Sequence, residues 1–369
     1  WERANWFAPE GVEPKNDFTF EIPGWFEYVA AEHKNARENV VLIDQTSFCK
    51  FEVTGRGALE FLNRLCANQI DRPVGKVIYT QMCNDRGTIE CDMTIGRLAT
   101  DKFLVVVGTA FGLRTSWWIK NHMPDDGSVS FHEVTSAYAV INVIGPKSRT
   151  LLEKTTNAGL SNNDFPFGTC RHFTVGYAPV ISFRVTYVGE LGYELYIPME
   201  FAGHVYETLW EAGQDLGIKN AGYRTIASTH LEKGYADWGS ELTPEYTPFD
   251  AGLGFCVALE KDDFIGKDAL AKIKTEGPKW ALRTLTIDVG SPLMLQGSAP
   301  ILHNGNVLGV TSSSGYGHTI GKNICYGNLP ADMADVTDGY EIESYKIVYP
   351  AQLETSRQLY DPERKRIFA

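Results

Sequence analysis

The sequence contains no apolar run long enough to span a membrane. Its longest apolar stretch lies around Phe103–Val107, well short of the roughly 18 to 20 residues that a membrane-spanning helix needs. Basic residues are outnumbered, with 34 Lys and Arg against 46 Asp and Glu and a net charge of −12. Because nucleic-acid binding requires clustered Lys and Arg, we predict neither a nucleic-acid nor a membrane partner. A local basic pocket for a small anion remains compatible with this balance.

Disulfide and metal-binding motifs are missing as well. The seven cysteines form no Cys-x-x-Cys pair, and the eight histidines show neither His-x-x-x-His nor His-Glu-x-x-His spacing. A disulfide framework and a metal site built from neighbouring ligands are therefore not expected. The chain begins with Trp1 and shows no signal peptide. We predict reduced, mostly buried thiols and a location in the cytoplasm, or in the mitochondrial matrix of a eukaryote.

Two short segments resemble known motifs but are interpreted as turns. After Gly55-Arg56-Gly57, Glu60 stands where a dinucleotide-binding turn needs a third small residue. We expect a tight turn into a helix with an apolar face formed by Ala58, Phe61, Leu62, Leu65 and Cys66. The run Ser312–Gly315 lacks the Gly-x-Ser-x-Gly elbow of a nucleophilic serine and is also predicted to be a turn.

The length of 369 residues predicts two or three domains, and 43% hydrophobic with 22% charged residues is typical of soluble globular chains. Periodicity predicts helices at Phe26–Arg37, Gly112–His122, Phe201–Leu216 and Arg224–Gly234. In the second of these, Leu113, Trp117 and Trp118 are expected to be the apolar residues. The predicted strands are Val40–Ile43, Ile89–Gly96, Phe103–Val107, Ala139–Ile144, Val180–Tyr187 and Glu194–Ile197.

The last part of the chain has a different character. From residue 280 onward, short β-like runs alternate with Gly, Pro and Asn, and no helix is predicted. Asn304-Gly305 between two apolar runs predicts a two-residue hairpin. We expect two α+β lobes followed by a small β-barrel or sandwich.

A polar turn at Asn84–Thr88 leads into a strand that carries two carboxylates. Alternation sends Ile89, Cys91 and Met93 to one face and Glu90 and Asp92 to the other. Two carboxylates on one face are costly to bury unless a cation lies opposite. Composition alone favours a half-solvated strand face, and a functional carboxylate is the alternative.

A second polar segment runs from Tyr187 to Tyr196, where a glycine-bearing turn joins two strands. A carboxylate such as Glu194, just past the turn, can accept two parallel N–H bonds from a planar amidine-like edge. The pterin ring of folate presents such an edge, and so does an arginine of the protein itself. On spacing alone, a structural salt bridge is the simpler interpretation.

Sequence blocks spread from the first residue to the last carry a family resemblance. Arg37–Phe48, Val53–Gly55 and Phe61–Asn63 resemble the folate-dependent aminomethyltransferase family, typified by the T-protein of the glycine cleavage system. Other blocks resemble more closely the tetrahydrofolate domain of dimethylglycine and sarcosine dehydrogenases and oxidases. These blocks are Trp1–Phe7, Ala221–Arg224, Leu231–Tyr235, Glu245–Pro248, Ala251–Phe255 and Leu359–Pro362.

The resemblance implies an α+β fold: a three-lobed cloverleaf of two ferredoxin-like α+β lobes and a C-terminal β-barrel around a central folate channel. Residues 1–50 and 137–265 would form the first, folate-binding lobe. Residues 51–136 would form the second lobe, which carries Asp92, and residues 266–369 the barrel lobe.

The resemblance also implies site residues for tetrahydrofolate. The catalytic aspartate of the family falls on Asp92, and its tyrosine and pterin-binding glutamate fall on Tyr187 and Glu194. Arg224 resembles the arginine of a Gly-Tyr-Arg block and is the third expected folate-binding residue. No metal ligand is implied. Gly96, where some members have tyrosine, favours the dehydrogenase-linked branch.

The implied activity is transfer of a methylene or methyl group from an N-methyl amine, such as dimethylglycine or sarcosine, to N5 of tetrahydrofolate. Partners would be the small-molecule donor and a flavin-dependent dehydrogenase domain or subunit. Three alternatives stay open: a free-standing demethylase with a sulfonium or quaternary ammonium donor, a glycine-cleavage aminomethyltransferase, and a non-catalytic folate-binding protein. Lys233-Gly234-Tyr235 lacks the cysteine that marks the non-catalytic relatives.

Overall fold

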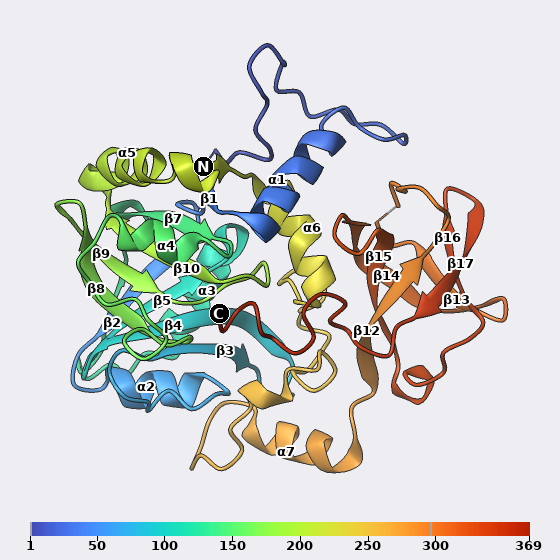
Figure 1. The fold of residues 1–369 in the computed structure, drawn as a ribbon. Coiled ribbons are helices and arrows are strands. Elements are labelled where there is room, and N and C mark those ends of the chain that lie inside the picture. Colours follow the sequence, from blue (N-terminus) through green and yellow to red (C-terminus); the bar gives the residue numbers. More distant parts are fainter. Residues whose placement is uncertain (1, 296) are drawn as a thin grey trace.

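Three bodies make up the computed structural model, which describes residues 2–295 and 297–369 (Figure 1). Two β-sheets with their helices occupy one side of the molecule, and a closed β-barrel lies on the other side of α6. Trp1, which opens one of the sequence blocks named above, lies outside the described residues. Within those residues, no helix combines the length and the apolar character needed to cross a membrane.

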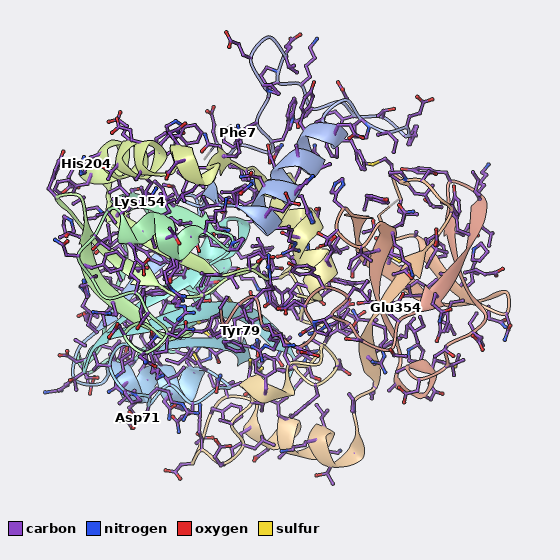
Figure 2. The ribbon with its side chains drawn as sticks, in the orientation of Figure 1. Phe7, Asp71, Tyr79, Lys154, His204 and Glu354 are labelled. Atoms are coloured by element: carbon purple, nitrogen blue, oxygen red, sulfur yellow. The ribbon has the colours of Figure 1, made fainter. Side chains whose placement is uncertain are left out.

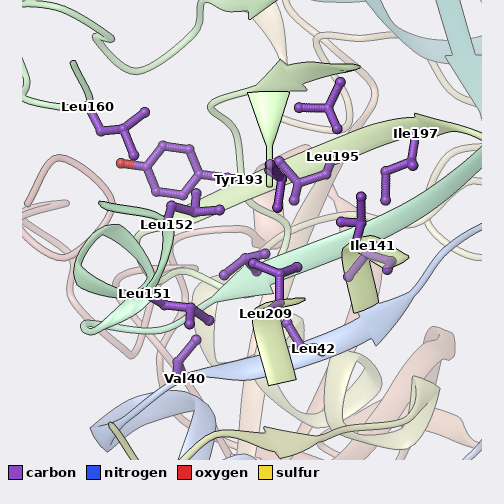
Figure 3. Close-up of a cluster of buried hydrophobic side chains, with 14 of the residues drawn as sticks. Val40, Leu42, Ile141, Leu151, Leu152, Leu160, Tyr193, Leu195, Ile197 and Leu209 are labelled. Atoms are coloured by element: carbon purple, nitrogen blue, oxygen red, sulfur yellow. The ribbon is translucent and has the colours of Figure 1, made fainter. Parts of the chain in front are cut away.

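The first sheet has six strands in the order β11-β1-β7-β10-β9-β8. They are β1 (Val41–Asp44), β7 (Tyr138–Ile144), β8 (Cys170–Val175), β9 (Ala178–Phe183), β10 (Gly192–Pro198) and β11 (Lys219–Asn220). Helices α4 (Ser148–Glu153) and α5 (Ala202–Ala212) cover one face through Leu151 and Leu209, which join the apolar cluster in Figure 3. Helices α1 (Phe26–Glu38) and α6 (Tyr223–Lys233) pack on the opposite face.

The second sheet has five strands in the order β3-β4-β5-β2-β6. They are β2 (Cys49–Thr54), β3 (Val77–Cys83), β4 (Ile89–Ala99), β5 (Lys102–Val107) and β6 (Ser130–Glu133). Helices α2 (Ala58–Leu65) and α3 (Gly112–Asn121) cover one face. The apolar face predicted for α2 is confirmed, since all five of its residues are buried: Ala58, Phe61, Leu62, Leu65 and Cys66.

The barrel is closed by six strands in the order β12-β15-β14-β13-β16-β17. They are β12 (Trp280–Ile287), β13 (Pro300–His303), β14 (Asn306–Gly317), β15 (Lys322–Pro330), β16 (Tyr340–Ser344) and β17 (Ile347–Leu353), preceded by helix α7 (Lys267–Glu276). The predicted hairpin is confirmed, because Asn304 and Gly305 join β13 to β14 with φ of 50° and 79°, as a two-residue turn requires.

Short 3₁₀ helices complete the connections. They are η1 (Thr109–Phe111), η2 (Thr135–Ala137), η3 (Met199–Phe201), η4 (Gln214–Leu216), η5 (Gly254–Cys256) and η6 (Ala331–Met333). All seven cysteines are free and buried, which confirms the predicted burial of the thiols. The division of the chain into three folding units at the boundaries given above stays a prediction.

Three local predictions are wrong in whole or in part. In α3, Leu113 and Trp117 are 87% and 62% exposed, whereas Trp118 packs against the core as predicted. The buried residues of the helix are Gly112, Thr115, Ser116 and Ile119. A Cβ added at Gly112 would lie 2.2 Å from Cys49 Sγ, so the first turn of α3 lies in close contact with β2. The serine run Ser312–Gly315, predicted to be a turn, lies inside β14, where the register shifts at a bulge. The strand predicted at Val180–Tyr187 ends earlier, at Phe183.

The second sheet packs its helix-free face against the first sheet, on the side that also carries α1 and α6. Leu104 and Val106 of β5 contact a cluster that includes Phe183 of β9 and Tyr196 of β10. Gly96 of β4 lies directly against the ring of Phe183, because a Cβ built there would be 2.2 Å from Cζ. The absence of a side chain at this position therefore serves the contact between the sheets.

Replacing Gly96 with alanine should destabilise the protein by about 1–3 kcal/mol, since the added methyl group must displace a buried aromatic ring. The midpoint of urea unfolding measures this loss. Gly203→Ala in α5 is the matched control, because no atom lies within 4 Å of the Cβ that it would add. Equal midpoints for the two variants would contradict the proposed close packing.

Candidate functional site

Asp92 lies on the side of β4 that faces the first sheet. The Tyr79 hydroxyl donates a hydrogen bond of 3.0 Å to Asp92 Oδ2, and Gln81 is the cross-strand neighbour of Asp92. Burial raises the pKa of Asp92 to about 6, although the hydrogen bond from Tyr79 lowers it. Part of its surface is still reached by solvent. Asp92 is therefore a carboxyl group that can exchange a proton near neutral pH.

Glu90, the second carboxylate on this face, has a different environment. Arg114 forms an ion pair with Glu90, and Asn84 donates a further hydrogen bond of 2.7 Å. The predicted alternation is confirmed, because Ile89, Cys91 and Met93 are buried while Glu90 and Asp92 stay partly exposed. The structure thus separates the two acids: one is neutralised by an arginine, and Asp92 has no cationic partner in the described part of the chain.

Glu194 lies on β10, with Asn142 and Phe183 as its cross-strand neighbours. The Tyr196 hydroxyl donates a hydrogen bond of 2.6 Å to Glu194 Oε2. Burial raises the pKa of Glu194 to about 7, and the hydrogen bond from Tyr196 lowers it. Among residues 2–295 and 297–369 no arginine or lysine pairs with this carboxylate. The structural salt bridge that spacing alone favoured is not formed.

Asp92 and Glu194 lie on the facing surfaces of the two packed sheets. Asp92 shares its side of β4 with Gly96, which contacts Phe183, the cross-strand neighbour of Glu194. Both carboxylates are half-buried, in contrast to the fully buried apolar residues around them. Two acids without cations therefore occupy one interface between the sheets.

Tyr187 lies in the loop between β9 and β10 and belongs to the same region. Its hydroxyl donates a hydrogen bond of 2.9 Å to the Ala236 carbonyl, and its ring stacks on His230 at a centroid distance of 5.3 Å. Burial raises the pKa of Tyr187, and the negative charge of Asp92 contributes to the shift. Tyr187 and Asp92 thus share one electrostatic environment.

Arg224 has other neighbours. Its guanidinium lies 3.7 Å from the centre of the Trp25 ring, and Nη2 donates to Asn16 Oδ1 at 3.2 Å. Burial lowers its pKa. The structure therefore places Arg224 at the start of α6 against the N-terminal segment, and none of its described contacts is with Asp92, Tyr187 or Glu194.

Two residues of this region escaped the sequence reasoning. Tyr79 hydrogen-bonds Asp92, and Figure 2 shows it near the middle of the molecule, where the sheets approach the barrel. Asp237, after α6, lies close enough for the charge of Asp92 to raise its pKa. The pairing of Tyr79 with Asp92 depends on the register of β3 with β4. A sequence pattern signals a strand but not its register.

The chain matches two family models. Residues 1–261 match the GCVT N-terminal domain, and residues 281–361 match the glycine cleavage T-protein C-terminal barrel domain. The fold agrees with this result. The crystal structure of glycine cleavage system aminomethyltransferase T from Bartonella henselae superposes with a TM-score of 0.80 at 23% identity, over 90% of this chain and 89% of that one. The predicted fold class is confirmed.

Curated relatives extend the comparison. The 4-methylaminobutanoate oxidase (formaldehyde-forming) of Paenarthrobacter nicotinovorans is 38% identical over 99% of this chain and 44% of its own length. The mitochondrial dimethylglycine dehydrogenase of Mus musculus is 34% identical over 100% of this chain and 42% of its own length. The chain therefore spans less than half of these two relatives.

A third relative has nearly the same extent as this chain. The aminomethyltransferase of Halothermothrix orenii is 35% identical over 85% of this chain and 88% of its own length. The two family models together cover most of the sequence, including the strands that carry Asp92 and Glu194. The chain thus belongs to the GCVT family, the folate-dependent aminomethyltransferase type that its sequence blocks resemble.

Proposed function

We propose that this protein transfers a one-carbon unit from an N-methyl amine, such as dimethylglycine or sarcosine, to N5 of tetrahydrofolate. The observation that supports it most is a pair of carboxylates on the facing surfaces of the two sheets, Asp92 and Glu194, which no described Lys or Arg neutralises. Asp92 would be the catalytic residue. Glu194, Tyr187 and Arg224 would bind the folate.

The donors and acceptors present fit a pterin ring. Glu194 accepts one hydrogen bond, from Tyr196, and keeps acceptor capacity for the paired N–H groups of a pterin. Asn142, its cross-strand neighbour, donates to Gln45, while its Oδ1 is buried without a hydrogen-bond partner. An unpaired buried oxygen is costly. A ligand that donates hydrogen bonds to this surface would remove that cost.

Tetrahydrofolate, when bound, would supply the nucleophilic nitrogen of the reaction. Asp92 would stabilise the positive charge of the one-carbon donor and hold or release a proton, because its pKa of about 6 lies close to neutral pH. The Tyr79 hydroxyl fixes the orientation of Asp92 by its bond to Oδ2. Packing of the two sheets would hold donor and acceptor together, which contributes much of the rate gain in such reactions.

The relatives suggest how the donor is made. Two of them are named as an amine oxidase and an amine dehydrogenase, and both are more than twice as long as the matched region. We therefore include in the proposal a flavin-dependent dehydrogenase domain or subunit as a partner. It would oxidise the N-methyl amine, and this chain would receive the resulting methylene group.

A donor panel tests the proposal. The protein is incubated with tetrahydrofolate and with sarcosine, dimethylglycine or a sulfonium compound, with and without a flavin-dependent amine dehydrogenase. Mass spectrometry then separates 5,10-methylene from 5-methyl product. We expect protein-dependent methylene product only when the amine is oxidised. A methyl product without oxidation would identify a direct demethylase, and absence of any protein-dependent product would contradict the proposed reaction.

A further inference from the structure

Asp237 lies in the segment that leaves α6 and is held next to Tyr187. The Tyr187 hydroxyl donates to the carbonyl of the preceding residue, Ala236, at 2.9 Å. The backbone N–H of Asp237 donates to Glu241 Oε2, also at 2.9 Å. Both bonds hold the peptide group that precedes the Asp237 Cα, and on the other side the Asp237 carbonyl accepts from the Glu241 N–H at 3.0 Å. The backbone that carries the Asp237 side chain is therefore fixed by the fold.

The same segment packs on the second sheet near Asp92. Ala236 and Trp238, which flank Asp237, are buried in a cluster with Ile89 of β4, and Tyr79 of β3 packs against this cluster. Tyr79 in turn donates its hydrogen bond to Asp92. Asp237 and Asp92 therefore approach the same region from two different bodies of the molecule.

The pKa of Asp237 agrees with a position near Asp92. Burial raises the pKa of Asp237 to about 6; the charge of His230 opposes the shift, while the charges of Glu241 and Asp92 add to it. The side chain is nevertheless exposed to solvent. The Asp237 carboxylate therefore lies outside the packed core, at a position that water and a ligand can reach.

The carboxylates of Asp92, Asp237 and Glu241 take part in no ion pair of the described chain, and the positive charge of His230 acts on Asp237 from a distance. Glu241 is buried and accepts its hydrogen bonds from neutral groups, including the Ser313 N–H at 2.9 Å. Like charges held together without a counter-ion favour the binding of a cation.

A buried amide beside Asp92 points the same way. The neighbouring Tyr187 ring is held in place by stacking on His230 and on Tyr235, at centroid distances of 5.3 and 5.7 Å. Gln81 is fully buried beside Asp92, and neither of its amide atoms has a hydrogen-bond partner in the described chain. A polar group in that state is ready to bind a ligand.

We infer that Asp237 is a specificity residue that, together with Asp92, recognises the positive charge of the one-carbon donor. The donor class is then a cationic N-methylammonium or iminium compound, and an uncharged molecule of the same shape binds poorly. This inference rests on the proposed function, since it assigns the donor side of the same site. It involves binding only, and no bond is formed or broken by Asp237.

The test compares two ligands that differ in one charged atom. N,N-dimethylglycine carries an ammonium group where 3-methylbutanoate carries a neutral CH, and both have the same carboxylate. Their dissociation constants are measured by calorimetry on the full chain with saturating tetrahydrofolate. We expect the wild type to prefer the cation by about tenfold or more, and Asp237→Asn to lose most of that preference.

Asp125→Asn is the control, because Asp125 is exposed in a loop and its replacement changes the net charge equally. Affinity for tetrahydrofolate should be unchanged in both variants, which shows that they are folded. If Asp237→Asn retains the full preference for the cation, or weakens both ligands equally, the inference is wrong and the proposed function stands. If the wild type fails to bind tetrahydrofolate, the proposed function itself is wrong.

Discussion

Replacing Asp92 with asparagine is expected to lower the rate of one-carbon transfer by about 10²–10⁴-fold while tetrahydrofolate still binds. Asparagine keeps the shape of the side chain and can still pair with Tyr79, whose hydroxyl lies 3.0 Å from Asp92 Oδ2. It has no charge to stabilise a cationic donor and no proton to exchange. The variant therefore removes the chemistry of Asp92 with little change in packing.

Single-turnover rates with a methylene donor and the dissociation constant of tetrahydrofolate measure this separation. The control is Asp125→Asn, at an exposed loop position, which should match the wild type in both quantities. A variant that loses rate and affinity by equal factors would show that Asp92 binds folate without contributing to the reaction step. Our assignment of Asp92 as catalytic would then be wrong.

Replacing Glu194 with glutamine should weaken tetrahydrofolate binding by about 10–100-fold above neutral pH. A carboxylate can accept two parallel N–H bonds, whereas an amide can accept only one and presents an N–H to the other donor. Because burial raises the pKa of Glu194 to about 7, wild-type affinity should increase as the pH rises through that value. The affinity of the variant should not follow this increase.

The raised pKa of Glu194 also predicts how the stability of the ligand-free protein depends on pH. The folded-state pKa of about 7 lies above the ordinary glutamate pKa of 4.5, so the folded protein holds this proton more tightly than the unfolded chain. Stability of the wild type therefore falls as the pH rises from about 4.5 to about 7. Glu194→Gln lacks this ionisation and should be more stable than the wild type by about 1–3 kcal/mol above that window.

Urea unfolding at acidic and alkaline pH, together with tetrahydrofolate titrations, checks both parts. Glu207→Gln on α5 is the control, since Glu207 is exposed and should alter neither quantity. A variant that binds tetrahydrofolate as well as the wild type would remove Glu194 from the folate site. A variant that is less stable than the wild type at alkaline pH would contradict the burial of an unpaired charge.

Much of this arrangement is encoded locally and could be predicted. Strand alternation placed Asp92 on a face apart from Cys91 and Met93, and Asn304-Gly305 specified its hairpin through the positive φ that such turns require. Both features depend on residues that are neighbours in sequence. The sequence blocks added the fold class, which spacing alone did not determine.

Other features depend on contacts between distant segments and could not be predicted in this way. The first turn of α3 buries Gly112 in close contact with Cys49, while Trp117 is exposed. That no described residue forms an ion pair with Glu194 is decided by which side chains the opposite sheet presents. Asp237 reaches the neighbourhood of Asp92 only because the segment after α6 packs on β4.

A crystal structure of the full chain with tetrahydrofolate, grown above neutral pH so that Glu194 is ionised, tests the central claim most directly. We predict that the pterin ring lies between the two sheets, with its N–H edge hydrogen-bonded to the Glu194 carboxylate and its N5 side turned toward Asp92. A pterin bound elsewhere on the molecule, or between the sheets without contact to either carboxylate, would contradict the account.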